Sequence, residues 1–177
     1  MEDLYYSALD IAAIISSMRL GCQAESTFID LIWQEEKVFL APLYRKDKKK
    51  FILDVRYWLN YLYEKPALDA EIPAIQKDIE DSKGIIQAES YMSDFKNLDL
   101  FFKSVRIRIL HPDQRDYVRI KLRTLLSQYG YKRRSSSLIN HFNHCLYFYH
   151  LNITIRGGVS CSITDVGLDQ MIMFRVL

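Results

Sequence analysis

The sequence predicts an α+β protein that is mostly helical and whose clearest strands lie in its C-terminal half. Three observations support this prediction. Only six Gly and four Pro occur in 177 residues, which favours long regular elements over loops. Apolar residues make up 49% of the chain, enough for the dry core of one ordinary domain or two small ones. In most segments these apolar residues repeat with the period of a helix.

The N-terminal part, residues 1–65, is expected to form a helical subdomain. Apolar residues at helical spacing predict helices within 3–21 and 24–37, and a third over 54–65 that ends before a proline. Between the second and third helices, two short apolar runs flank the basic sequence RKDKKK, residues 45–50. This pattern predicts a β-hairpin or a basic loop.

The middle of the chain is acidic, and the C-terminal part is basic. Residues 66–84 are acidic and hold two of the four prolines, which predicts a linker with a helical second half, followed by a basic domain over 85–177. Residues 1–100 carry 12 Lys/Arg and 18 Asp/Glu, a net −6, whereas residues 101–177 carry 12 and 4, a net +8. This asymmetry indicates either that the basic half faces a polyanion, or that the two halves attract each other within the chain or across a dimer.

The C-terminal domain is expected to contain six elements in the order helix, strand, helix, helix, strand, strand. Their expected ranges are 85–104, 105–110, 112–129, 136–151, 152–158 and 170–177. The first strand is predicted because β-branched residues alternate there with Arg106 and Arg108. Pro112 suits the start of the following helix, and Ser135 or Ser136 can cap the helix after that.

This order of elements resembles that of winged-helix domains, which bind DNA. The resemblance is one of topology and rests on no sequence motif. It implies that residues 157–169, rich in Gly, Ser and Asp, form a wing between the last two strands, with Arg156 at its base. It also implies that the helix over 136–151 is the one presented to DNA.

Cationic residues of this domain predict binding to nucleic acid, with duplex DNA as the expected partner. On the predicted helix over 112–129, Arg115, Arg119 and Arg123 have the spacing i, i+4, i+8. They would form a ridge that contacts the phosphate backbone. A second group, Lys132, Arg133 and Arg134, lies in the turn before the next helix.

The outer face of the helix over 136–151 carries side chains that donate and accept hydrogen bonds. These are Ser137, Asn140, Asn143, His144 and Tyr147. An Asn side chain can pair with the edge of an adenine in the major groove. A homodimer is expected on DNA, because a single small module binds it weakly.

The same charges also fit a non-enzymatic adaptor or assembly subunit. Arginine ridges on amphipathic helices are commonly solvated or paired with acids, and the acidic N-terminal half can supply those acids. In this alternative the basic and acidic halves dock on protein partners, or on each other in a homodimer.

A further alternative is a ribonuclease. Arg134 and His141 resemble the R-x4-6-H motif of the HEPN ribonuclease superfamily. The resemblance implies metal-independent cleavage of RNA at a dimer interface, with the histidine transferring a proton and the arginine holding the phosphate. It requires both residues to lie on one helix, and the three serines after Arg134 instead favour a helix that starts later.

No metal or cofactor is expected. His141, His144, Cys145 and His150 lie close in sequence, but Cys145 belongs to the apolar stripe and no carboxylate accompanies the group. The three cysteines form no CxxC pair, and no phosphate-loop, dinucleotide, zinc-protease or hydrolase motif occurs. The sequence therefore favours a protein that is not an enzyme, soluble and cytoplasmic, without a membrane partner.

Overall fold

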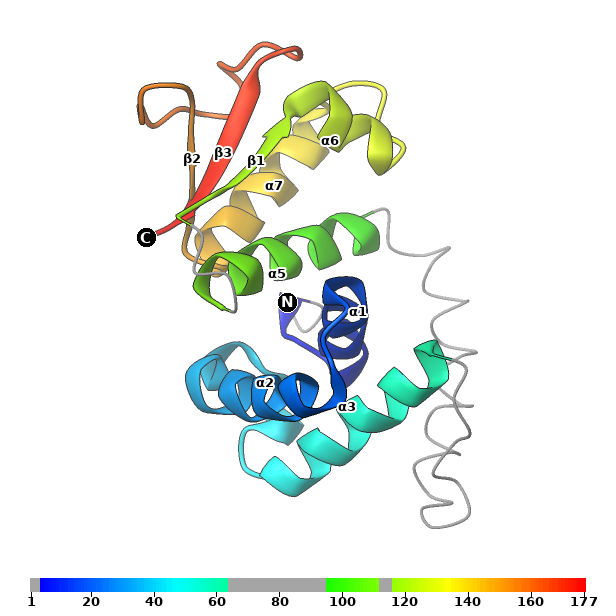
Figure 1. Ribbon diagram of the computed structural model, residues 1–177. Coiled ribbons are helices and arrows are strands. Elements are labelled where there is room, and N and C mark those ends of the chain that lie inside the picture. Colours follow the sequence, from blue (N-terminus) through cyan, green and yellow to red (C-terminus); the bar gives the residue numbers. More distant parts are fainter. Residues whose placement is uncertain (1–3, 64–94, 112–115) are drawn as a thin grey trace. The chain divides into compact units, whose positions relative to one another are not determined.

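The computed structural model describes residues 4–63, 95–111 and 116–177 (Figure 1). The chain divides into two compact units, Met1–Asp94 and Phe95–Leu177, each with its own core. The acidic linker expected at 66–84 lies outside the described residues, as does the start of the helix expected at 85–104. No helix in the described ranges combines the length and the hydropathy needed to cross a bilayer.

Over residues 4–63, the described part of unit 1, the chain forms three α-helices: α1 (Ala8–Met18), α2 (Cys22–Glu35) and α3 (Lys48–Leu62). The first helix begins with a capping box, in which the Ser7 hydroxyl accepts from the Asp10 amide and the Asp10 carboxylate accepts from the Ser7 amide. The segment before α1 is held by a parallel bridge between Tyr6 and Leu40. All three expected helices are therefore present.

The hairpin or basic loop predicted around residues 45–50 is wrong. Two short 3-10 helices, η2 (Lys37–Phe39) and η3 (Pro42–Tyr44), are followed directly by α3, whose first turn contains the lysines. The helix starts early because the Asp47 carboxylate accepts from the Lys50 amide at 2.9 Å and caps it. Lysine at a helix start is locally unfavourable, and here ion pairs to Asp30 and Asp54 compensate.

Unit 2 contains the six elements of the C-terminal half in the predicted order. They are α5 (Lys96–Leu110), β1 (Val118–Lys121), α6 (Leu122–Gln128), α7 (Ser136–Phe148), β2 (Leu151–Thr154) and β3 (Met171–Val176). The protein is thus α+β and mostly helical, as expected. The predicted cap on α7 is also confirmed, since the Ser135 hydroxyl accepts from the Leu138 amide at 3.2 Å.

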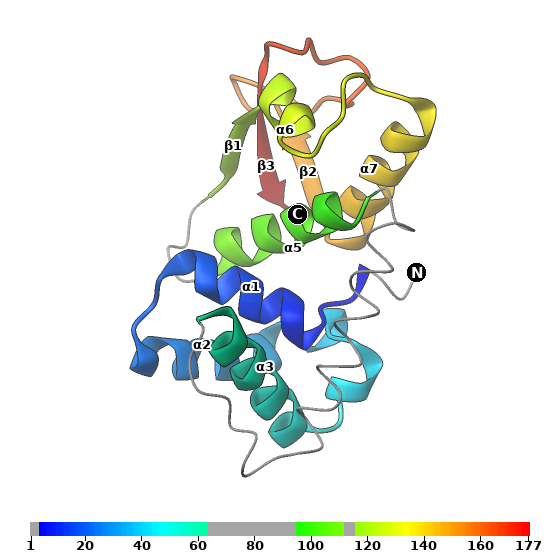
Figure 2. The ribbon, with the colours of Figure 1, turned by 90° about the vertical axis from the view of Figure 1, so that its right-hand side faces the viewer.

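The three strands form one antiparallel sheet in the order β1-β3-β2. The central strand β3 pairs along its length with both neighbours, and Phe174 lies opposite Val118 on one side and Ile153 on the other. Figure 2 shows the sheet and α7 on opposite sides of the unit, with β1 farthest from α7. The rings of Phe102, Phe142 and Phe174 fill the core between them, with centroids 4.7 to 6.1 Å apart.

The strand predicted at 105–110 is wrong, because these residues form the last turns of α5. The alternation of β-branched and Arg residues is real, but Arg106 does not point to solvent. It is 9% exposed, and its guanidinium donates to the Tyr149 carbonyl at 2.8 Å, which closes the C-terminal end of α7. Leu98, Phe102, Val105 and Ile109 are all buried at helical spacing, and this longer pattern overrides the six-residue alternation.

The helix predicted over 112–129 is wrong in its first half. Residues 112–115 lie outside the described ranges, and residues 118–121 form the edge strand β1, in which half-buried and exposed side chains alternate. Helix α6 starts at Leu122 because the amides of Leu122 and Arg123 donate to the carbonyls of Gln170 and Leu168. The first strand of the predicted order is therefore present, but residues 118–121 form it and residues 105–110 do not.

Candidate functional site

Helix α7 exposes one polar face and buries the other. Leu138, Phe142 and Cys145 are buried at spacings of four and three residues, which turns the opposite face of the helix to solvent. Five of the exposed residues were expected on the outer face: Ser137, Asn140, Asn143, His144 and Tyr147. Tyr147 is 85% exposed, so its ring is available to a partner. The helix contains no carboxylate, so nothing on this face repels an anion.

The three cations in the turn before α7 divide into two kinds. Lys132 and Arg133 are exposed to solvent. Arg134 instead turns toward the β2–β3 loop, where its Nη1 atom donates to the carbonyls of Ile163, Thr164 and Val166 at 2.6, 3.2 and 2.7 Å. Arg134, predicted to contact nucleic acid, therefore ties the loop after β2 to the start of α7.

The β2–β3 loop has an exposed tip and an anchored return. At the tip, the Ile155 amide donates to Val159, and Gly157 and Gly158 adopt φ values of +95° and +78° that favour glycine. Arg156, expected at the base of the wing, is instead exposed at this tip, because the turn closes over residues 155–158. Ile163 and Val166 on the return are each 2% exposed, so they pin the loop to the core while the tip projects.

The predicted arginine ridge does not form. Arg115 lies outside the described residues, Arg119 is exposed on strand β1, and Arg123 lies in the first turn of α6. Arg123 makes a bidentate pair with Asp169 at 2.9 and 2.8 Å. The Asp169 hydrogen bond raises the pKa of Arg123, and the same contact lowers the pKa of Asp169. Arg123 is thus paired within the unit.

A long stretch of unit 2 carries positive charge only. Between Asp116 and Asp165 the sequence contains no Asp or Glu. It contains seven cations in this stretch: Arg119, Lys121, Arg123, Lys132, Arg133, Arg134 and Arg156. Of the predicted contacts, the structure brings together the α7 face and the turn that carries Lys132 and Arg133, and it places Arg156 at the tip of the loop that Arg134 anchors. It leaves Arg119 on the far strand (Figure 2).

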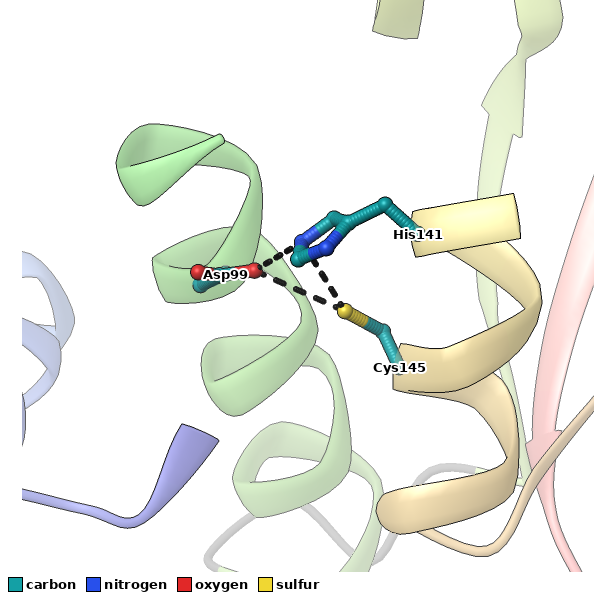
Figure 3. A group of neighbouring side chains, drawn as sticks. All are labelled: Asp99, His141 and Cys145. Atoms are coloured by element: carbon teal, nitrogen blue, oxygen red, sulfur yellow. Dashed lines mark hydrogen bonds and ion pairs between the residues drawn. The ribbon is translucent and has the colours of Figure 1, made fainter. Parts of the chain in front are cut away.

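A second group of polar residues lies between α5 and α7, on the side of α7 that faces away from solvent. The Nε2 atom of His141 is 2.5 Å from Oδ1 of Asp99, and Sγ of Cys145 is 3.5 Å from each of these atoms (Figure 3). Phe95 stacks on the His141 ring, with centroids 4.3 Å apart. Burial, together with the charge of Asp99, raises the pKa of the Cys145 thiol.

The sequence interpretation missed this group. No metal site was predicted, because no carboxylate lies near the histidines in the sequence. In the structure the carboxylate of Asp99, 42 residues before His141, lies beside the imidazole. The sequence does hold a signal, since His141 and Cys145 are spaced i, i+4 and so share one helix face with the apolar stripe. A histidine on a buried face needs a polar partner, and only the tertiary structure identifies it.

The geometry expected of the HEPN-like alternative is not present. Arg134 precedes α7, which starts at Ser136, so Arg134 and His141 do not lie on one helix. The guanidinium of Arg134 binds loop carbonyls and the imidazole of His141 binds Asp99. The two side chains therefore have separate partners and do not form a joint site.

The comparisons with known proteins add no functional information. The chain matches no protein-family model, and no curated protein and no solved structure shows significant similarity to it.

Proposed function

We propose that unit 2 binds duplex DNA, with the exposed face of α7 in the major groove. The observation that carries this proposal is a helix whose exposed face is polar and free of carboxylates, directly preceded by two exposed cations. In the proposed complex, Lys132 and Arg133 neutralise backbone phosphates next to the groove. Arg156, at the tip of the β2–β3 loop, contacts the backbone on the adjacent turn.

The side chains on the α7 face suit base edges. Asn140 and Asn143 each offer an amide that can pair with N6 and N7 of adenine, and His144, one turn after Asn140, is exposed on the same surface. Ser137, near the start of the helix, can donate to a phosphate or a base. The Arg134 contacts to the loop support the proposal too, because they set the distance between α7 and the tip that carries Arg156.

The order of elements also supports the proposal. The sequence α5, β1, α6, α7, β2, β3 with sheet order β1-β3-β2 resembles that of winged-helix domains. In that arrangement α7 corresponds to the helix that enters the groove, and the β2–β3 loop corresponds to the wing.

A salt titration of two matched double variants tests the proposal. Binding of the full chain to duplex DNA is measured over a salt series for the wild type, for Lys132→Ala/Arg133→Ala and for Arg119→Ala/Lys121→Ala. The slope of log K against log salt is negative, and we expect the first variant to reduce its magnitude by about 1.8, because two phosphate contacts are lost. The second variant removes the same charge from strand β1 and should leave the slope within about 0.5 of the wild type.

The control separates a defined interface from a general attraction. Equal losses in the two variants would mean that only net charge matters, and the α7 surface would not be the interface. No salt-dependent binding to duplex DNA by the wild type would overturn the proposal and leave the adaptor alternative. Sedimentation of the complex reports whether two chains bind together, as expected for a small module.

The base-reading role is tested separately. Asn140→Ala and Asn143→Ala should each weaken binding to a selected DNA site by about 1 to 3 kcal/mol while leaving the salt slope unchanged. Ser136→Ala, at the exposed start of the helix, is the matched control. If neither Asn variant weakens binding to that site more than Ser136→Ala does, α7 does not read bases.

A further inference from the structure

Three side chains of the kinds that ligate metal ions come from two helices and point their donor atoms at one spot inside unit 2. Asp99 comes from α5, and His141 and Cys145 come from successive turns of α7 (Figure 3). The three donor atoms, Oδ1, Nε2 and Sγ, lie within 4.8 Å of one another. The Asp99 side chain is 7% exposed and Cys145 is buried, whereas the His141 side chain is 21% exposed.

We propose that unit 2 binds a zinc ion through Asp99, His141 and Cys145. Tetrahedral zinc with ordinary bond lengths separates a sulfur ligand from a nitrogen or oxygen ligand by about 3.5 Å, and a nitrogen from an oxygen ligand by about 3.3 Å. Both distances from Sγ of Cys145 are 3.5 Å, so two of the three edges already have the required length. Only the edge from His141 to Asp99, at 2.5 Å, has to open, by about 0.8 Å.

The geometry differs from that of a nucleophilic triad. In a triad the two nitrogens of the imidazole serve two different partners, one the nucleophile and the other the carboxylate. Here the same atom, Nε2 of His141, is the contact of both the Cys145 sulfur and the Asp99 oxygen. Convergence of three donors on one point is the arrangement of a metal site.

The kinds of donor select the ion. A mixed set of thiolate, imidazole and carboxylate suits zinc, whereas magnesium and calcium prefer oxygen ligands alone. The charges of a carboxylate and a thiolate balance a divalent cation.

The surroundings hold the ligands in place and leave one approach. Phe95 stacks on the imidazole with an interplanar angle of 12°, which restricts rotation of the His141 ring. Because His141 is the most exposed of the three, a water molecule can complete the tetrahedron from its side. The ion would then cross-link α5 to α7 beneath the exposed α7 face, a role separate from DNA binding.

Cobalt absorption tests the site directly, because tetrahedral Co²⁺ substitutes for Zn²⁺ and its thiolate bond absorbs in the near ultraviolet. The Cys22→Ser/Cys161→Ser variant of the full chain leaves Cys145 as its only thiol. We expect Co²⁺ to give both the thiolate band and the strong visible bands of tetrahedral cobalt. One equivalent of Zn²⁺ should abolish them, and Zn²⁺ should raise the Tm of the same protein.

Three further variants locate the ligands. Adding Cys145→Ser to that background should remove the thiolate band, and Asp99→Asn should weaken cobalt binding at least about tenfold. His144→Ala, on the exposed face of the same helix, is the matched control and should leave the spectrum unchanged. Circular dichroism establishes that each variant is folded.

Two results would overturn the proposal. One is that the folded Cys22→Ser/Cys161→Ser protein, whose only thiol is Cys145, shows no tetrahedral cobalt spectrum and no Tm change with Zn²⁺. The other is a spectrum that persists in Asp99→Asn and Cys145→Ser but disappears in His144→Ala, which would place the ion on the surface. If Cys145→Ser fails to fold, the Asp99→Asn result decides.

Discussion

Arg134 lies in a run of three cations, yet its guanidinium donates hydrogen bonds to backbone carbonyls of a loop about 30 residues away in sequence. Loops without regular pairing leave carbonyl groups without hydrogen-bond donors, and an arginine, with several N–H donors, can hydrogen-bond to more than one of them. Three such carbonyls, from Ile163, Thr164 and Val166, converge on one Nη1 atom. The neighbours Lys132 and Arg133 have the same charge but remain exposed, so position within the fold, and not charge alone, separates their roles.

Replacement of Arg134 should therefore affect stability, while replacement of Arg133 should not. We expect Arg134→Ala to lower the free energy of unfolding by about 2 kcal/mol, because charge-assisted hydrogen bonds to part-buried carbonyls are lost. Arg133→Ala removes the same charge from an exposed site and should change stability by less than about 0.5 kcal/mol. Urea denaturation of both variants measures the difference. Equal effects would mean that the loop does not depend on the Arg134 contacts.

Helix α7 is the element on which both proposals depend, and local interactions define its start. The Ser135 hydroxyl satisfies the Leu138 amide, and extended backbone at Ser135 sets the first turn. Its C-terminal end is closed from another helix, by the Arg106 guanidinium on the Tyr149 carbonyl. The start of the helix was thus readable from the sequence, whereas the contact at its end required the tertiary fold.

Loss of the cap is expected to destabilise unit 2 measurably. Ser135→Ala should cost about 1 kcal/mol, since the Leu138 amide loses its acceptor. Ser137→Ala, two residues into the same helix and exposed, should be neutral within about 0.5 kcal/mol, because alanine is the better helix former. Chemical denaturation followed by circular dichroism compares them. A Ser137→Ala loss as large as that of Ser135→Ala would argue against a specific cap.

Strand β1 shows how an element can be correctly counted and wrongly placed. Both 105–110 and 118–121 alternate apolar and basic residues, so periodicity alone does not distinguish them. The first segment continues a helix whose apolar residues are buried over four turns, and the second lies where β3 can pair with it. Pairing between residues 50 to 56 positions apart decided the outcome.

The division of charge between the two units is a property of the whole molecule. Unit 1, Met1–Asp94, holds 11 Lys/Arg and 17 Asp/Glu, a net −6, and unit 2, Phe95–Leu177, holds 13 and 5, a net +8. A polyanion that approaches unit 2 is therefore attracted by that unit and repelled by the other. Added salt screens interactions between distant charges most strongly. It should therefore weaken the repulsion between the polyanion and unit 1 more than it weakens direct contacts between cations and phosphates.

Removal of unit 1 should therefore strengthen DNA binding at low salt. If residues 95–177 fold alone, as circular dichroism can establish, the fragment should bind duplex DNA more tightly than the full chain at about 50 mM salt. The difference should shrink toward about 200 mM salt, where the Debye length is shorter. Fluorescence anisotropy with labelled DNA measures both affinities. A fragment that binds more weakly at every salt concentration would show that unit 1 contributes contacts of its own.

The sequence by itself determined the features that depend on neighbouring residues. These include the mostly helical α+β class, the capped start of α7, its exposed face with Asn140 and His144, and the two final strands. Each follows from periodicity, capping or turn chemistry within a few residues, which the chain carries whatever its tertiary fold.

Only the tertiary structure decided which polar groups meet. It turned Arg134 onto the loop carbonyls, paired Arg123 with Asp169, and placed Asp99 beside His141 and Cys145. Partners that lie 29 to 46 residues apart leave no periodic trace in the sequence. The physical reason is that a part-buried or paired polar side chain must find a complementary group in space, and the packing of α5, α7 and the sheet determines which group is within reach.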